Sequence, residues 1–140
     1  MQDKTNAHLK GSCLCGAIKY QVTKLEPNMA HCHCSMCRKF HGAAFSTFGE
    51  ALTENFTWLQ GESYLKNFTA ENGTTRQFCS QCGSSLTFAS STNTGSTVEF
   101  SLATLDTPIL ERPDAHIYCQ SKADWYQITD GLTQFQRDRE

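Results

Sequence analysis

The chain has 140 residues, of which 39% are hydrophobic and 19% are charged, and this composition suits one globular domain and excludes a disordered chain. Its 12 basic and 14 acidic residues give a formal net charge of −2, which excludes the basic excess of a generic nucleic-acid-binding protein. No apolar run reaches the length of about 18 residues that a membrane-spanning helix needs.

The chain carries eight cysteines, and their chemistry depends on the redox compartment. Residues 1–6 lack the apolar core of a signal peptide, so we expect a cytoplasmic protein whose thiols stay reduced. In that setting clustered cysteines favour metal binding, and a mixed disulfide framework is the alternative. No linker composition interrupts the chain, so we expect a single domain over residues 1–140.

The first cysteine pair precedes the first predicted strand. Cys13 and Cys15 are followed directly by Gly16, and residues 17–22 then alternate inward and outward positions, as a half-buried strand does. Glycine at this position lets the backbone turn with positive φ, so that amides can point at the thiolates. Two thiolates from one short turn can reach one metal ion, so this turn is half of a candidate metal site.

The second cluster consists of Cys32, Cys34 and Cys37, with His31 and His33 beside it. The one short helix that the sequence predicts, residues 35–41, begins inside this cluster. Three protein ligands with an open fourth position are typical of catalytic zinc, so the spacing indicates an open metal site. A fourth ligand from a distance, Cys119 or a histidine, would instead close the site and make it structural.

Strand patterns dominate the rest of the chain. Aromatic-rich or alternating segments predict strands at residues 44–48, 56–59, 64–68, 75–78, 85–88 and 98–102. Gly61 and Glu62 predict a hairpin turn between the second and third of these strands. The polar residues 90–96 predict an exposed hairpin loop. The fold class is therefore mainly β, with several small sheets.

The third cluster, Cys79 and Cys82, lies at the tip of the hairpin predicted from residues 75–78 and 85–88, and Gly83 follows it. This arrangement is typical of a zinc knuckle. Joined to the first pair, it gives a four-thiolate set that suits structural zinc and leaves the second cluster with three thiols. We expect Arg76 nearby to offset thiolate charge or to pair with a carboxylate.

Three ordered segments, residues 11–17, 31–38 and 76–83, closely resemble the glutathione-dependent formaldehyde-activating family, which includes the centromere-protein-V-like proteins. The C-terminal residues 116–130 are also similar to that family, so the resemblance covers about residues 11–135. A lone C-x-x-C motif would be weak, whereas three cysteine motifs in this order are specific.

The resemblance implies a β-tent fold of several small stacked antiparallel sheets built around two Zn²⁺ ions per chain. It implies a structural zinc and an active-site zinc, whose ligands are Cys13, Cys15, Cys79 and Cys82 for the first and Cys32, Cys34 and Cys37 for the second. It implies carbon–sulfur lyase-type chemistry, the formation or cleavage of a thiol–aldehyde adduct, with glutathione and formaldehyde as the namesake pair. The sequence departs from the family pattern at Cys119, Asp124 and Thr133, which affects the C-terminal segment and not the ligands.

The adduct chemistry needs a proton donor for the new alkoxide, and His31, His33 and His41 are the candidates closest in sequence to the second cluster. We expect a small thiol and a small aldehyde as partners, and neither nucleic acid nor a membrane. Two other functions fit the same cysteines: a non-catalytic zinc-stabilised binding module, and a thiol/zinc redox sensor. The sequence predicts no oligomeric state.

Overall fold

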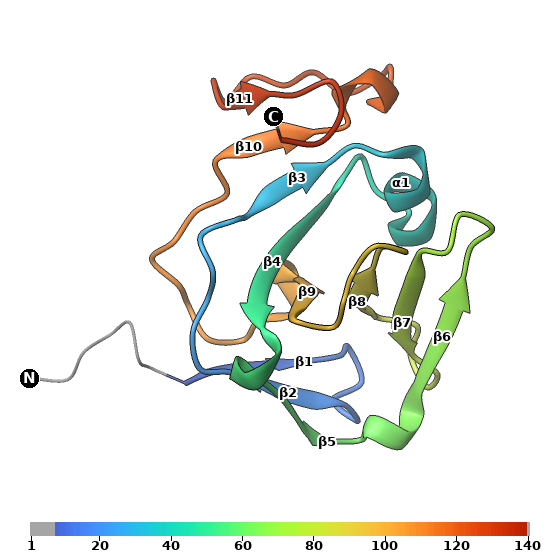
Figure 1. Ribbon diagram of the computed structural model, residues 1–140, viewed down its shortest axis with the longest axis vertical. Coiled ribbons are helices and arrows are strands. Elements are labelled where there is room, and N and C mark those ends of the chain that lie inside the picture. The colour runs from blue at the N-terminus through green and yellow to red at the C-terminus, as the bar shows by residue number, and fades with distance from the viewer. Residues whose placement is uncertain (1–7, 140) are drawn as a thin grey trace, which may run out of the picture.

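Two sheets and one short helix make up the fold. The structure, a computed structural model, describes residues 8–139. Strands β1, β2 and β5 form a 3-stranded sheet, and the other strands form an 8-stranded sheet in the order β11-β10-β3-β4-β9-β8-β7-β6. Figure 1 shows the larger sheet curving from the red β11 to the green β6, with the small sheet at its lower end. The prediction of a mainly β fold is confirmed.

The elements are short. The strands are β1 Leu9–Ser12, β2 Lys19–Val22, β3 Ala30–Cys32, β4 Ser46–Leu52, β5 Phe56–Gln60, β6 Leu65–Thr69, β7 Thr75–Cys79, β8 Ser85–Ala89, β9 Thr97–Ser101, β10 Ala115–Ile117 and β11 Thr133–Gln134. The helix α1 spans Ser35–His41, as the sequence predicts. Four short 3-10 turns cover Thr53–Asn55, Glu62–Tyr64, Leu102–Thr104 and Cys119–Ser121. In the described residues no helix has the length and hydrophobicity to cross a membrane.

Most pairings in the sheets are antiparallel, as predicted, and β10 is the exception. It pairs in parallel with both β3 and β11. The predicted hairpin of β7 and β8 and the exposed loop between β8 and β9 are both present. The sequence patterns do not predict strands β1, β3, β10 and β11, which have 2 to 4 residues. Strand β2 is as short as β1, but the alternation of residues 17–22 extends beyond it and makes it readable.

The hairpin predicted around Gly61 and Glu62 is wrong. Strand β5 pairs with β2 in the small sheet, whereas β6 pairs with β7 in the large one. The residues between them form the 3-10 turn Glu62–Tyr64, which carries the chain from one sheet to the other. Gly61 has a φ of 76°, and a Cβ there would lie 2.0 Å from the carbonyl oxygen of Ala17, so the crossing depends on close backbone contact.

A buried apolar cluster holds the two sheets together. It consists of Tyr20 and Val22 from β2, Ala51 from β4 and Phe100 from β9. The ring of Tyr20 stacks on that of Phe56, with the centroids 5.0 Å apart. These contacts hold the small sheet against β4 and β9. The cysteines lie outside this core, in two separate and smaller buried clusters.

Candidate metal centres and a thiol-lined cavity

The first and third cysteine pairs come together in space. Cys13 and Cys15 lie in the turn between β1 and β2, and Cys79 and Cys82 lie in the turn between β7 and β8. Their four Sγ atoms all lie within 4.8 Å of one another, with 3.6 Å between Cys13 and Cys15 and 3.9 Å between Cys15 and Cys79. A zinc tetrahedron with bonds of about 2.3 Å places its sulfur atoms about 3.8 Å apart. This four-cysteine cluster could therefore hold a metal ion.

Backbone amides support the four-cysteine cluster. The N–H of Ile18 donates to the Sγ of Cys13 at 3.3 Å, and the N–H of Gln81 donates to the Sγ of Cys79 at 3.3 Å. Both glycines that follow the cysteine pairs adopt positive φ, 79° at Gly16 and 83° at Gly83. The glycine turns predicted from the sequence are therefore present, and they aim peptide dipoles at sulfur.

The remaining three cysteines lie where β3 meets α1. Cys32 ends β3, Cys34 is the N-cap of α1, and Cys37 is the buried residue of the helix. The Sγ atoms of Cys32 and Cys37 are 3.4 Å apart. The three sulfur atoms are not all within 4.8 Å of one another, in contrast to the four sulfur atoms of the four-cysteine cluster. Half-buried Cys34 instead lies on the wall of the same cavity as the close pair. These residues are called the three-cysteine cluster below.

Arg76 supplies positive charge to the three-cysteine cluster. Its side chain is only 4% exposed, its guanidinium lies 5.5 Å from the ring centres of both Phe40 and Phe88, and its Nη2 is 3.5 Å from the Sγ of Cys37. The hydrogen bond with Cys32 and the nearby guanidinium lower the pKa of Cys37 to about 6, against the effect of burial. The sequence placed Arg76 next to Cys79, and the structure shows that it offsets charge at the other cluster.

A cavity of about 490 Å³ opens in front of the three-cysteine cluster, and all three thiols line it. Strands β4, β9, β8 and β7 supply its floor, with the side chains of Phe48, Glu50, Glu99, Phe88 and Arg76. Tyr118 lines the cavity too and has a φ of 56°, in the left-handed region that residues other than glycine seldom adopt. Strained backbone of this kind clusters at functional sites. The cavity is large enough for a small thiol compound.

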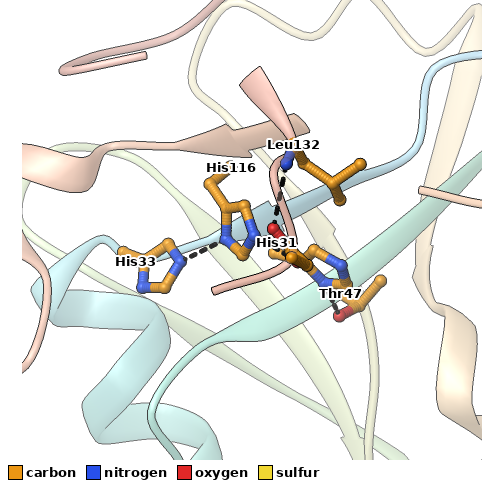
Figure 2. A network of polar contacts seen from close by, with 6 residues as sticks. His31, His33, Thr47, His116 and Leu132 are labelled. Atoms are coloured by element: carbon orange, nitrogen blue, oxygen red, sulfur yellow. Dashed lines mark hydrogen bonds and ion pairs between the residues drawn. The ribbon is translucent and has the colours of Figure 1, made fainter. Parts of the chain in front are cut away.

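Behind β3, away from the cavity, a chain of polar contacts runs from Asp130 to His33. Figure 2 shows His33 pointing toward His116, with a distance of 2.7 Å from His33 Nε2 to His116 Nδ1. The Nε2 of His116 lies 2.9 Å from a carboxylate oxygen of Asp130, and His31 Nδ1 lies 2.7 Å from the hydroxyl of Thr47. One ligand atom from each of His31, His116 and Asp130 falls within 4.8 Å of the others, so these residues could also hold a metal ion.

The structure places the candidate proton donors away from the cavity. His31 and His33 belong to the network behind β3, and the Nε2 of His41 lies 3.3 Å from the hydroxyl of Ser85. None of the three lines the cavity. Burial lowers the pKa of both His33 and His41 to about 4, so these two side chains are neutral at pH 7.

Cys119, the alternative closing ligand, also lies outside the cavity lining. It begins the 3-10 turn Cys119–Ser121, and its N–H donates to the carbonyl oxygen of Phe135 at 3.0 Å. Sequence reasoning missed Glu50 and Glu99, because only the pairing of distant strands brings them to the thiols. Tyr118, His116 and Asp130 lie in the C-terminal segment that resembles the family, and this resemblance was the only sequence signal for them.

Three comparisons with known proteins bear on this site. A family model described as "Glutathione-dependent formaldehyde-activating enzyme" matches residues 8–121. A curated protein of Halomonas elongata, named provisionally as a glutathione-dependent formaldehyde-activating enzyme, is 31% identical over 130 residues that cover 86% of this chain and 80% of that protein. A Rhodobacter sphaeroides protein with a crystal structure superposes with a TM-score of 0.60 at 23% identity, over 72% of this chain and 91% of that one, and so has a similar fold.

Proposed function

Because the chain belongs to the glutathione-dependent formaldehyde-activating enzyme family, we propose that it forms or cleaves a thiol–aldehyde adduct in the cavity of the three-cysteine cluster. The substrates are a small thiol of the glutathione type and a small aldehyde such as formaldehyde. The observation that carries the proposal is the buried Arg76 against Cys37 on the wall of a cavity that all three thiols line.

We assign a metal ion to each cysteine cluster. Cys13, Cys15, Cys79 and Cys82 hold a structural zinc, and Cys32, Cys34 and Cys37 hold a zinc at the active site. The donors of the second set fit zinc, because two sulfurs are in contact, the pKa of one is already low, and the third lies on the same wall. When bound there, zinc would lower the pKa of an incoming thiol and so supply its thiolate near neutral pH.

In the forward direction the thiolate sulfur of the substrate attacks the carbonyl carbon of the aldehyde. A carbon–sulfur bond forms, the π electron pair moves to the oxygen, and the oxygen takes up one proton to give an S-hydroxyalkyl thioether, a hemithioacetal. The reverse step removes that proton, restores the carbonyl and returns the bonding pair to sulfur. The reverse step cleaves the carbon–sulfur bond without water or a redox change and leaves a C=O double bond, which is a reaction of the lyase class.

The residues of the cavity suit this step. The guanidinium of Arg76 stabilises negative charge on sulfur at the end of the cavity where the three thiols lie. Phe48 and Phe88 also line the cavity and make its lining more apolar. Burial and neighbouring acidic groups raise the pKa of Tyr118, so its phenol keeps its proton at neutral pH. Because Tyr118 packs against the core of Cys32 and Cys37, it can donate a hydrogen bond to the oxygen that becomes charged.

Replacing Cys34 by Ser tests the proposal. We expect the variant to lose adduct formation, measured by NMR with ¹³C-formaldehyde and glutathione, and to bind one zinc in place of two, while circular dichroism shows an unchanged fold. Cys119→Ser is the matched control and should keep activity and both metal ions. An active Cys34→Ser protein, or one that unfolds and loses both metal ions, would contradict the proposal.

A thiol redox role is the second candidate. It is favoured by the 3.4 Å between the Sγ atoms of Cys32 and Cys37 and by the lowered pKa of Cys37, because a low-pKa thiol beside a second thiol is typical of redox sensors. Peroxide treatment followed by mass spectrometry would then show a Cys32–Cys37 disulfide. Loss of adduct formation on oxidation without such a disulfide would count against this role.

A further inference from the structure

Two histidines and an aspartate converge on the side of β3 that faces away from the cavity. The parallel register of β3 and β10 places His116 directly opposite His31, so both imidazoles lie on the same face of the sheet, with ring centres 4.8 Å apart. Asp130 reaches the same place from the segment before β11, and one of its carboxylate oxygens lies 2.9 Å from the Nε2 of His116. These groups, called the His–His–Asp cluster below, come from three separate parts of the chain.

The spacing of the cluster suits a metal ion. One ligand atom from each of the three residues lies within 4.8 Å of the other two. Bonds of about 2.1 Å from an ion to nitrogen or oxygen place two neighbouring ligands about 3.0 to 3.4 Å apart, for angles between a right angle and the tetrahedral angle. The 2.9 Å between His116 and Asp130 is close to the lower end of this range. An ion can therefore replace the proton that these two groups share, with little movement of either.

Both histidines of the cluster are oriented by a contact at the Nδ1 atom. The Nδ1 of His31 lies 2.7 Å from the hydroxyl of Thr47, and the Nδ1 of His116 lies 2.7 Å from the Nε2 of His33. Figure 2 shows Thr47 and His33 on the outer sides of the two imidazoles. Partners of this kind fix the tautomer and the ring orientation of histidines that bind metal ions. Since Nδ1 is engaged in each ring, Nε2 is the nitrogen that remains for an ion.

Asp130 supplies negative charge and a route from the solvent. One carboxylate oxygen faces His116, and the other accepts the N–H of Leu132 at 3.0 Å, so the carboxylate is held in place. The side chain is 44% exposed, which lets an ion approach from water. Within residues 8–139 neither a lysine nor an arginine pairs with this carboxylate. Its charge is therefore free to attract a cation.

The histidines are kept inside the protein at a cost to stability, which is an observation independent of the ligand spacing. His33 and His116 are both fully buried, and the Nδ1 of His33 has no hydrogen-bond partner in the part of the chain that the structure describes. A buried polar atom without a partner costs stability, and apolar side chains of similar size would avoid this cost. Departures of this kind from good packing are expected at functional sites.

We infer that His31, His116 and Asp130 bind a divalent first-row transition-metal ion, at a site separate from both cysteine clusters. Imidazole and carboxylate ligands suit ions such as Zn²⁺, Fe²⁺ and Co²⁺. The ion joins β3 and β10 to the segment before β11, and its remaining coordination positions face water beside Asp130. Because the site offers three ligands and one negative charge, it holds the ion more weakly than a thiolate cluster, and dialysis against metal-free buffer removes it. The inference does not depend on the proposed function, because the site lies outside the cavity.

Co²⁺ tests the inference, because thiolate ligands give this ion an intense charge-transfer absorption that nitrogen and oxygen ligands do not. Zinc-loaded wild-type protein, dialysed as above, should bind one equivalent of Co²⁺ without that absorption. Asp130→Asn keeps the shape of the side chain and should weaken this binding more than 10-fold, and Thr47→Val, which removes the outer partner of His31, should weaken it about 10-fold. Asp124→Asn, at an exposed position of the same C-terminal segment, is the matched control and should bind Co²⁺ as wild type does.

Each outcome of the titration supports or overturns the site. It is overturned if wild-type protein binds Co²⁺ only with the thiolate absorption, or if Asp130→Asn and Asp124→Asn bind it equally well. His31→Gln is the second variant, for the case in which Asp130→Asn fails to fold, and a folded His31→Gln protein that keeps wild-type binding overturns the site as well. Protein that makes no thiol–aldehyde adduct but binds this Co²⁺ supports the inference and contradicts the proposed function.

Discussion

In the four-cysteine cluster the sulfur atoms face one another, whereas in the three-cysteine cluster they face a cavity. The first set is drawn from two turns, and backbone N–H groups point at two of its sulfurs. The second set comes from the junction of β3 and α1, and a buried arginine offsets its charge. Cysteine side chains therefore lie in two different environments in this protein, and the groups that surround the sulfur atoms distinguish the two clusters.

This difference has an energetic side. Four thiolates within 4.8 Å would repel one another strongly, so with the proposed structural zinc the folding of the turns would be coupled to metal binding. At the three-cysteine cluster the guanidinium of Arg76 already compensates one thiolate. Under the proposed function, that part of the fold would persist without a metal ion, and a zinc bound there would have a coordination position for the substrate.

The largest effect is expected from Cys79→Ser. Cys79 is fully buried and supplies one sulfur of the four-cysteine cluster, so the change removes one of the four ligands of the proposed structural zinc. Because the binding free energy of a structural zinc is folding free energy, we expect a loss of about 5 kcal/mol or more and an unfolded chain at room temperature. Zinc content and far-UV circular dichroism measure it. A folded Cys79→Ser protein with an unchanged melting temperature would contradict the prediction that folding depends on the four-cysteine cluster.

Only part of the difference between the two cysteine clusters could be predicted from the sequence. The spacing of the cysteines and the glycines after two pairs predicted the four-cysteine cluster, because each pair lies within one turn and needs only local geometry. The helix over residues 35–41 and seven of the strands were also readable from local patterns. What surrounds the thiols was not, because Arg76, Glu50 and Glu99 reach the cavity through strand pairings that no local pattern encodes.

The histidines show the same limit. Their position beside the second cluster made His31 and His33 candidate proton donors. The alternation of an extended chain sends the side chain of His33 to the face opposite Cys32 and Cys34. There it meets His116, which is 83 residues away in the chain. Proximity in sequence was therefore a poor guide to which groups share the cavity.

A smaller effect is expected from His116→Leu. His116 is fully buried and bridges His33 and Asp130, so its loss leaves the Nε2 of His33 buried without a partner. An unsatisfied buried polar group costs about 1–3 kcal/mol, and we expect the free energy of unfolding to fall by about that amount in a urea titration. His8→Leu, at an exposed position, is the control and should leave stability unchanged.

The His116→Leu variant also sharpens the comparison of the clusters. The network lies behind β3, the strand that carries Cys32, whereas the four-cysteine cluster lies in the turns between β1 and β2 and between β7 and β8, so that cluster should keep the proposed metal ion. Chelator titration should show that the metal ion of the three-cysteine cluster is released more readily than in wild-type protein. Equal release from both clusters would mean that the network acts on the whole fold and not on one cluster.

The smallest effect concerns Glu99 and pH. Its folded-state pKa of about 7 lies above the ordinary value of 4.5, so the folded chain binds this proton more tightly than the unfolded chain. The stability that this proton contributes is complete below pH 4.5 and is lost as the pH rises through about 7. Glu99→Gln removes that dependence. The stability of wild type relative to the variant should therefore fall by about 1–2 kcal/mol between pH 5 and pH 8, after allowance for solvent screening.

Denaturant titrations at both pH values measure this difference. The cysteine clusters are the same in both proteins, so their own pH dependence cancels, and Glu62→Gln should follow wild type at both values. Parallel stability curves for wild type and Glu99→Gln would mean that Glu99 is ionised without cost. The cavity would then carry no uncompensated acidic charge, and it would differ from the four-cysteine cluster only in shape.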